Sequence, residues 1–291
     1  MGLIGKTRTV LEMIKFEHSV FALPFALTGA LLAVRGSGLD GRELAVKFAW
    51  IIVAMIAARS AAMAFNRVAD AEIDALNPRS RMRAIPAGAV SKSFTWGFIA
   101  FWSGVFVLAA HLLNPLCLKL SPLALAIVFG YSYTKRFTAL SHLALGFALG
   151  IAPAAAWIAV RGSLDAQILL LTAAVALWTA GFDIIYACQD HDFDREAGLH
   201  SIPVTLGIRN ALLVSRLLHA AMIALLVWLA RAMDLGLLSL AGVAVVAALL
   251  VYEHLLVKPD DLSRVNAAFF TVNGFVSVLF LVFWAADILW T

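Results

Sequence analysis

Residues 66–88 read NRVADAEIDALNPRSRMRAIPAG and follow a long apolar run that ends at Phe65. The stretch brings several carboxylates and guanidinium groups together at the end of an apolar segment. Charge at this density beside a membrane-spanning segment has to meet water, a metal ion or a charged ligand. The stretch therefore predicts a polar site at one surface of a membrane protein.

The first acidic group in this stretch is spaced for one face of a helix. If the helix continues through Asp74, then Asn66, Asp70 and Asp74 lie four residues apart and within about 80° of one another. Two carboxylates and an amide oxygen on one face are suited to Mg²⁺, which takes oxygen ligands. Arg67, Arg83 and the other arginines nearby can pair bidentately with phosphate oxygens. Together they predict a magnesium and diphosphate site.

Composition identifies the chain as an integral membrane protein. Of its 291 residues, 63% are hydrophobic and 14% charged, and the mean hydropathy is +0.92. The apolar runs lack the alternation of strands and have the length of spanning helices, about 20 residues each. We expect an all-α helical bundle with about nine transmembrane spans, over residues 16–35, 46–66, 93–113, 115–133, 140–160, 166–187, 208–231, 236–256 and 265–289.

The distribution of charge predicts the orientation. With nine spans, most of the 22 lysines and arginines fall on the side of the N terminus, which the positive-inside rule makes cytoplasmic. No cleavage pattern follows the first span, so we expect it to remain as an anchor. The net charge of +4 then follows from topology and predicts no nucleic-acid partner. Cys117 and Cys188 are expected on opposite sides, without a disulfide.

A second acidic group follows the sixth span. Asp183, Asp190 and Asp194 are spaced seven and four residues apart, within about 40° on a helix, whereas Asp192 falls nearly opposite Asp190. A loop with Ser201 and a proline comes next, much as a proline-containing loop follows the first group. Four spans separate the two groups, so both emerge on the same side. This parity predicts one shared site in a central cavity that opens to the cytoplasm.

Further basic and phenolic residues leave two interpretations open. Arg59 lies inside the second span, seven residues before Asn66, and therefore shares its face; it either looks into the cavity or forms a structural ion pair. The fourth span ends in Tyr131-Ser-Tyr-Thr-Lys135-Arg136. Its two cations are either ligand-binding groups or interfacial anchors with snorkelling side chains.

At these residues the chain resembles the UbiA superfamily of membrane aromatic prenyltransferases. Its first motif, Asn-x-x-x-Asp-x-x-x-Asp, matches residues 66–74, and its second, Asp-x-x-Tyr followed by Asp-x-x-x-Asp, matches residues 183–194. The Tyr-x-x-x-Lys feature matches Tyr131 and Lys135, and an arginine is frequent at the position of Arg59. The Arg-Pro loop of the family is interrupted here by residues 84–85. The resemblance covers nearly the whole chain, as a single domain over residues 1–291.

The resemblance implies transfer of a polyprenyl group from polyprenyl diphosphate to an aromatic carboxylate acceptor. In the bacterial branch whose motifs have a similar sequence, the acceptor is 4-hydroxybenzoate, in ubiquinone biosynthesis. The alternative acceptor is 1,4-dihydroxy-6-naphthoate, in menaquinone biosynthesis. It places the enzyme in the bacterial inner membrane and implies no obligate protein partner. The implied Mg²⁺ ligands are Asn66, Asp70, Asp74, Asp183, Asp190 and Asp194. The implied catalytic residues are Asp70, Asp74, Asp190, Asp194, Lys135 and Arg136. The implied substrate-binding residues are Arg59, Arg67, Arg83, Tyr131, Tyr186 and Ser201.

Two rival classes share parts of this pattern. A secondary transporter also carries charge within its spans, but usually near the midplane on broken helices, whereas here the charge collects at one membrane face. A lipid-head-group transferase uses aspartates and Mg²⁺, but its Asp-Gly…Ala-Arg…Gly…Asp…Asp motif is absent from the sequence. The arrangement of charge therefore favours prenyl transfer.

Overall fold

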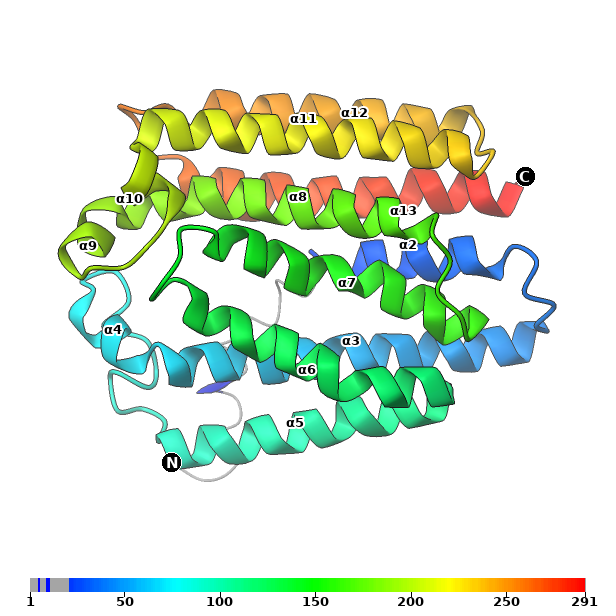
Figure 1. Ribbon diagram of the computed structural model, residues 1–291, viewed down its shortest axis with the longest axis horizontal. Coiled ribbons are helices and arrows are strands. Elements are labelled where there is room, and N and C mark those ends of the chain that lie inside the picture. The colour runs from blue at the N-terminus through cyan, green and yellow to red at the C-terminus, as the bar shows by residue number, and fades with distance from the viewer. Residues whose placement is uncertain (1–4, 6–8, 11–20, 291) are drawn as a thin grey trace.

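The computed structural model describes residues 5, 9–10 and 21–290, and in this part of the chain it consists of helices and one isolated β-bridge between Lys258 and Asp261. Among these described residues, eight helices are long and apolar enough to span a membrane, and α2 is a shorter apolar helix. The main helices, drawn in Figure 1, are α2 (Leu23–Val34), α3 (Gly41–Ala69), α5 (Lys92–Leu113), α6 (Pro115–Thr134), α7 (Ser141–Arg161), α8 (Ile168–Ala187), α11 (Ile208–Ala232), α12 (Leu237–Leu256) and α13 (Asn273–Trp290).

The predicted spans agree with these helices, and the all-α fold class is confirmed. The first predicted span, 16–35, begins outside the described residues. Cys117 and Cys188 are free thiols, as expected. What hydropathy did not predict are the short elements α4 (Ala71–Leu76), η2 (Cys188–Asp190), α9 (His191–Glu196), α10 (Ile202–Leu206) and the π-helix η3 (Ala267–Val272).

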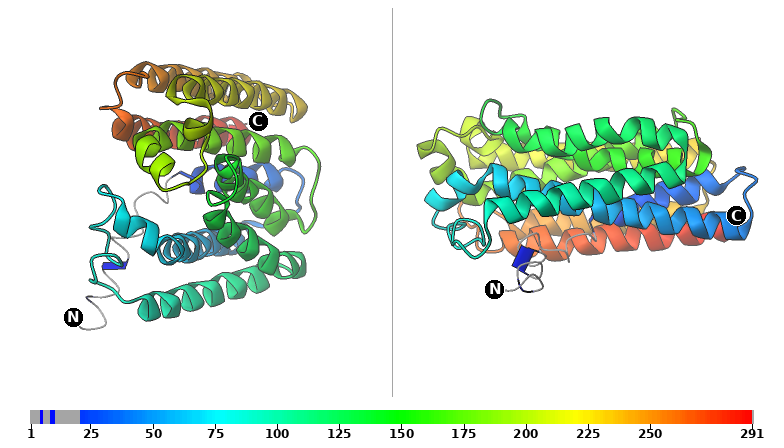
Figure 2. Two further views of the ribbon diagram at one scale, coloured as in Figure 1. Left: turned by 60° about the vertical axis from the view of Figure 1, so that its left-hand side comes forward. Right: turned by 90° about the horizontal axis from the view of Figure 1, so that it is seen from below.

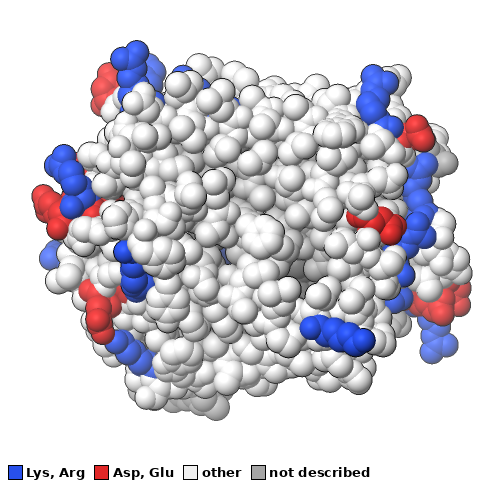
Figure 3. Space-filling view, in the orientation of Figure 1, with Lys and Arg blue, Asp and Glu red and all other residues white. Residues whose placement is uncertain are grey.

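The long helices run side by side, and α4, α9 and α10 gather at one end of the bundle (Figures 1 and 2). The α11–α12 hairpin covers one side of the bundle and α5 the other. In the space-filling view, charged side chains are concentrated toward the two ends and an almost uncharged band separates them (Figure 3). An apolar band between two charged ends is the surface that a bilayer requires. The protein is therefore a multi-pass membrane protein.

Close helix contacts hold the centre of the bundle together. On α7, a Cβ built on Gly146 would lie 2.2 Å from the carbonyl oxygen of Ala176 in α8. On α2, a Cβ on Gly29 would lie 2.5 Å from the carbonyl oxygen of Pro153 in α7. Small residues at such crossings let helix backbones approach closely, which is how apolar helices pack without a hydrophobic driving force. The helices α2, α7 and α8 therefore form a tightly packed core beside the cavity.

This packing predicts a stability difference between two glycine variants. Gly146→Ala should lower the free energy of unfolding by about 1–3 kcal/mol, because the added methyl group overlaps the α8 backbone. Gly104→Ala on α5 is the matched control, since nothing lies within 4 Å of its Cβ position; it should be neutral or slightly stabilising. Thermal unfolding in detergent measures both. Equal transition temperatures would contradict the packing argument.

Candidate active site

One cavity of about 930 Å³ contains both acidic groups and extends into the apolar interior. Its polar lining comes from the end of α3, the residues after it, the end of α6, the start of α7 and the α8–α9 region. Its apolar lining comes from deeper positions such as Met55 in α3, Phe106 in α5, Leu125 in α6 and Leu149 in α7. The prediction that the two acidic groups share one cavity is therefore supported by the structure.

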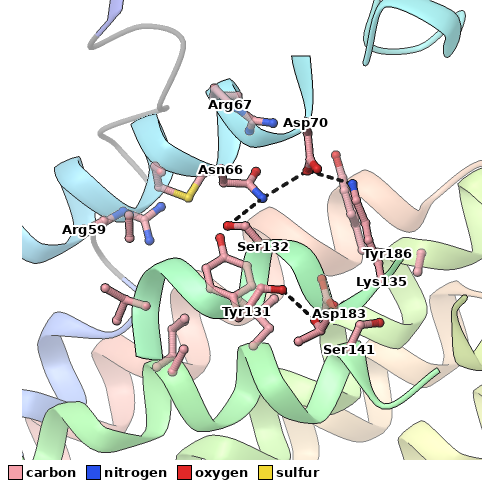
Figure 4. Close-up of a pocket in the computed structure, with 18 of the residues that line it drawn as sticks. Arg59, Asn66, Arg67, Asp70, Tyr131, Ser132, Lys135, Ser141, Asp183 and Tyr186 are labelled. Atoms are coloured by element: carbon pink, nitrogen blue, oxygen red, sulfur yellow. Dashed lines mark hydrogen bonds and ion pairs between the residues drawn. The ribbon is translucent and has the colours of Figure 1, made fainter. Parts of the chain in front are cut away.

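Asp70 lies at the centre of the first acidic group and is almost fully buried. Its Oδ2 accepts hydrogen bonds from Lys135 Nζ at 2.7 Å and from Asn66 Nδ2 at 3.1 Å, and Asn66 also donates to Ser132 Oγ at 3.4 Å (Figure 4). Asp70 itself separates α3 from α4, so the expected continuous helix is interrupted there. The hydrogen bond from Asp74 N to Asp70 O, at 2.8 Å, keeps the four-residue spacing across the break.

Arg136 lies next to this group but does not line the cavity. Its two terminal nitrogens donate to Ser132 O at 2.9 Å and to Ala69 O at 2.7 Å, and one lies 3.4 Å from Asp70 Oδ1. Ala69 is the last residue of α3, so Arg136 caps the carbonyl end of that helix. Arg136 thus binds the carbonyl end of α3, whereas Lys135 lines the cavity.

The loop after α4 connects the first acidic group to the second. Arg79 Nε donates to Asp190 Oδ1 at 2.9 Å, and its NH1 donates to the Tyr186 hydroxyl at 2.8 Å. Asn77 Nδ2 also donates to Asp190 Oδ1, at 3.1 Å, while its own Oδ1 accepts from the Arg79 backbone at 2.9 Å. Burial alone would lower the pKa of Arg79, but the hydrogen bonds and charge of Asp190 outweigh it and raise that pKa. Arg79 therefore stays cationic.

A neighbouring ion pair and the second acidic group complete the polar lining. Arg83 NH1 lies 2.6 Å from Asp74 Oδ1, and Asp74 is almost fully buried. The chain turns through η2 between α8 and α9, and both Asp190 and Asp194 line the cavity. Asp192 lies outside the lining with its side chain 81% exposed, on the side that its helical phase predicts.

His142 at the start of α7 holds the remaining carboxylate, Asp183. The Ile202 backbone N–H donates to His142 Nε2 at 3.3 Å, so the ring proton lies on Nδ1. Nδ1 then donates to Asp183 Oδ2 at 2.7 Å. The histidine thus ties α7 and α8 to the first turn of α10, where Ser201 caps the helix and also lines the cavity.

Two arginines in α3 line the cavity with unused hydrogen-bonding capacity. The Nε atoms of Arg59 and Arg67 are buried and have no hydrogen-bond partner among the described residues. Tyr131 lines the same cavity, between Arg59 and Asp183 in the close-up (Figure 4). Buried guanidinium groups with free N–H donors are suited to an anionic ligand group.

The donor set has the chemistry of a site for a hard cation. The carboxylates and the amide of Asn66 supply oxygen atoms, the ligands that Mg²⁺ takes. Among the described residues, no three His, Cys, Asp or Glu side chains already form a group that could hold a metal ion. Four carboxylates are instead paired with a cation or a histidine: Asp70, Asp74, Asp183 and Asp190. Metal binding by these residues fits their chemistry and remains a prediction.

The comparisons with known proteins point to one family. The model of the UbiA prenyltransferase family matches residues 22–287. A protein of Vibrio atlanticus named 4-hydroxybenzoate octaprenyltransferase is 30% identical over 258 residues, which cover 87% of this chain and 89% of the relative. The apo structure of a UbiA homolog from Aeropyrum pernix K1 has a TM-score of 0.83 and 36% identity, over 94% of this chain and 98% of that one. A UbiA homolog from Archaeoglobus fulgidus, solved with GPP and Mg²⁺, shares the fold with a TM-score of 0.69 at 19% identity, over 96% and 99% of the two chains.

The contacts of His142 predict a stability loss when its ring is removed. His142→Leu should destabilise the protein by about 1–3 kcal/mol, because Asp183 loses its donor and the buried Ile202 N–H loses its acceptor. His111→Leu is the control, since His111 is exposed at the end of α5. Thermal unfolding of the two variants in the same detergent compares them. A transition temperature for His142→Leu equal to that of the control would show that these contacts contribute nothing.

Proposed function

The chain belongs to the UbiA prenyltransferase family, and from this premise we propose that it transfers a polyprenyl group from polyprenyl diphosphate to 4-hydroxybenzoate. The reaction joins the prenyl C1 to the ring carbon ortho to the hydroxyl. The curated relatives at about 30% identity carry the name 4-hydroxybenzoate octaprenyltransferase, which supports this acceptor. Family membership excludes the secondary transporter considered from the sequence.

The single observation that carries the proposal is the division of the cavity into a charged end and an apolar extension. The charged end holds carboxylates, Lys135 and arginines, and the extension runs between apolar side chains of α3, α5, α6 and α7. A prenyl diphosphate has the same division, with an anionic head and an apolar tail. The head would lie between the acidic groups, and the tail would lie along the apolar helices toward lipid.

The residues that would hold Mg²⁺ are Asn66, Asp70, Asp74, Asp183, Asp190 and Asp194. Mg²⁺ bound there neutralises charge on the leaving diphosphate. The UbiA homolog from Archaeoglobus fulgidus was solved with Mg²⁺ together with GPP or DMAPP, which supports the use of a divalent cation. Lys135, Arg67, Arg79 and Arg83 lie among these carboxylates and would contact the diphosphate oxygens directly.

In the proposed reaction the C1–O bond of the donor breaks and the diphosphate leaves with the electron pair. Cationic groups placed beforehand around the departing oxygens stabilise the charge that builds there. The resulting allylic cation is attacked by the aromatic carbon, the new C–C bond forms, and the ring carbon loses its proton. The apolar walls exclude water, which would otherwise capture the cation. A carboxylate, Asp70, Asp74 or Asp190, would accept the phenolic proton, and the proton lost from the ring carbon would then restore the hydroxyl.

The acceptor carboxylate would lie against Arg59, whose buried Nε has no partner among the described residues. Tyr131 lines the cavity beside it. Both candidate acceptors, 4-hydroxybenzoate and 1,4-dihydroxy-6-naphthoate, carry a carboxylate, so this contact serves either one. We place the protein in the bacterial inner membrane with this end of the bundle in the cytoplasm, as the positive-inside rule predicts.

The proposed function predicts which products purified protein makes. With farnesyl or longer diphosphate and Mg²⁺, mass spectrometry should detect prenylated 4-hydroxybenzoate, and excess chelator should abolish it, because carboxylates cannot approach a diphosphate without a cation. The naphthoate offered in parallel is the control for acceptor choice. Product from the naphthoate alone would replace the proposed acceptor, and full turnover in chelator would contradict the metal requirement.

The different positions of Lys135 and Arg136 predict different kinetic effects. Lys135→Met should lower kcat/KM for the donor by about tenfold to a hundredfold, the effect of losing one charge-assisted contact in the transition state. The acceptor KM should change much less. Arg136→Met should chiefly lower the transition temperature, because it removes the cap of α3. Steady-state kinetics with each substrate varied separately, together with thermal unfolding, separate the two. Equal losses of donor kcat/KM would show that Arg136 also reaches the diphosphate.

A further inference from the structure

A buried polar cluster lies among α8, α12 and the start of α13, away from the acidic site. It consists of Trp178 in α8, Glu253 in α12 and Asn273 at the start of α13, and none of the three exposes any surface. Polar groups this deep in an apolar bundle are costly unless they are paired, and they mark functional positions in membrane proteins. We call these three residues the Asn273 cluster.

Every polar group of the Asn273 side chain is engaged. Its Oδ1 accepts from Trp178 Nε1 at 2.8 Å, and because an indole N–H can only donate, this contact fixes the orientation of the amide. Its Nδ2 donates to Glu253 Oε1 at 2.8 Å and to the carbonyl oxygens of Ala268 at 3.2 Å and Phe269 at 3.3 Å. Asn273 thus links α8 and α12 to the turn that precedes α13.

That turn is the π-helix η3, Ala267–Val272. A π-helical turn carries one residue more than an α-helical turn and is uncommon, and it occurs frequently at functional sites. If it relaxed to a regular α-helix, the residues in the first part of the turn and those before it would rotate by up to about 100° relative to α13. The Asn273 amide donates to the carbonyl oxygens of Ala268 and Phe269 within this turn, and so holds the π-helical form of the turn and the direction of its side chains.

The π-helix presents two consecutive phenylalanines to the cavity, Phe269 and Phe270. The Phe269 ring lies 4.2 Å from the Tyr186 ring and 5.2 Å from the Phe182 ring, and the Phe270 ring lies 5.9 Å from Tyr186, measured between centroids. The Tyr186 hydroxyl accepts from Arg79, which pairs with Asp190. These four rings form an aromatic wall that adjoins the acidic site.

We propose that Asn273 is a positioning residue, which, through η3, sets the aromatic wall against the first isoprenoid units of the donor. This inference rests on the proposed function, because it assigns the wall to the part of the donor next to the diphosphate. The acidic site binds the head, and the distance and angle of the wall select the chain that follows it. Loss of the Asn273 amide changes donor selectivity while the acidic groups and their cations stay intact.

The test compares Asn273→Leu and Phe269→Leu with wild type, as full-length protein in detergent. The donors are dimethylallyl and farnesyl diphosphate, which differ in the units that follow the first, at a fixed concentration of 4-hydroxybenzoate. Both variants should lose about tenfold or more in donor kcat/KM, because a small misplacement of a positioning group costs rate on this scale. The ratio of kcat/KM between the two donors should shift by about threefold or more. The acceptor KM, measured in a second series with 4-hydroxybenzoate varied at a fixed farnesyl diphosphate concentration, should stay near its wild-type value.

Ser239→Ala is the matched control. Ser239 is a buried α12 residue that donates to Asp287 of α13 at 2.8 Å, so the variant also removes a polar contact between these two helices, at the far end of α12 from Glu253. It should keep the wild-type donor ratio. If Asn273→Leu does not fold, Phe269→Leu decides alone, because it alters the wall itself. A wild-type donor ratio in folded Asn273→Leu or in Phe269→Leu, or the same shift in Ser239→Ala, would overturn the inference. A wild type that transfers neither of these prenyl groups nor a longer one would overturn the proposed function, and this inference with it.

Discussion

Carboxylates at the end of an apolar bundle need partners, and this constraint arranges the polar end of the protein. An unpaired buried charge costs several kcal/mol, so each buried carboxylate draws a donor from another part of the chain. Lys135 brings the end of α6 to Asp70 at the end of α3, and His142 brings α7 to Asp183 in α8. Arg79 brings the loop after α4 to Asp190. The ion pairs that neutralise the carboxylates thus also hold together the helices and the loop that surround the charged end of the cavity.

The helical architecture could be predicted because the length of an apolar run is fixed by the thickness of a bilayer. The run over residues 93–113 appears as α5, Lys92–Leu113, and the run over residues 208–231 appears as α11, Ile208–Ala232. The π-helix η3 and the turn at η2 could not be predicted in this way. They differ from an α-helix by one hydrogen-bond register, and a change of register leaves the apolar content of the segment unchanged.

The acidic residues of the candidate site could be predicted because they repeat at helical spacing, which is a signal that a single sequence contains. Their partners could not: Asn77, Arg79 and His142 are single residues whose roles depend on elements that meet only in the folded chain. A lone histidine at the start of an apolar helix carries no pattern that separates it from a core histidine. The neighbours Lys135 and Arg136 show the same limit, because they look alike in sequence and only Lys135 lines the cavity.

The observed ion pairs also bear on how the proposed substrates would bind. A divalent cation alone would take the carboxylates from Lys135, Arg79 and Arg83 and leave those three cations without their carboxylate partners. A diphosphate alone would take the cations and leave the carboxylates unpaired. When both bind together, each carboxylate exchanges a side-chain cation for the metal, and each side-chain cation exchanges a carboxylate for a phosphate oxygen. In the proposed site, charge balance would therefore couple the two binding events. In the proposed reaction this coupling would keep the charged end paired until the donor and its metal are both in place.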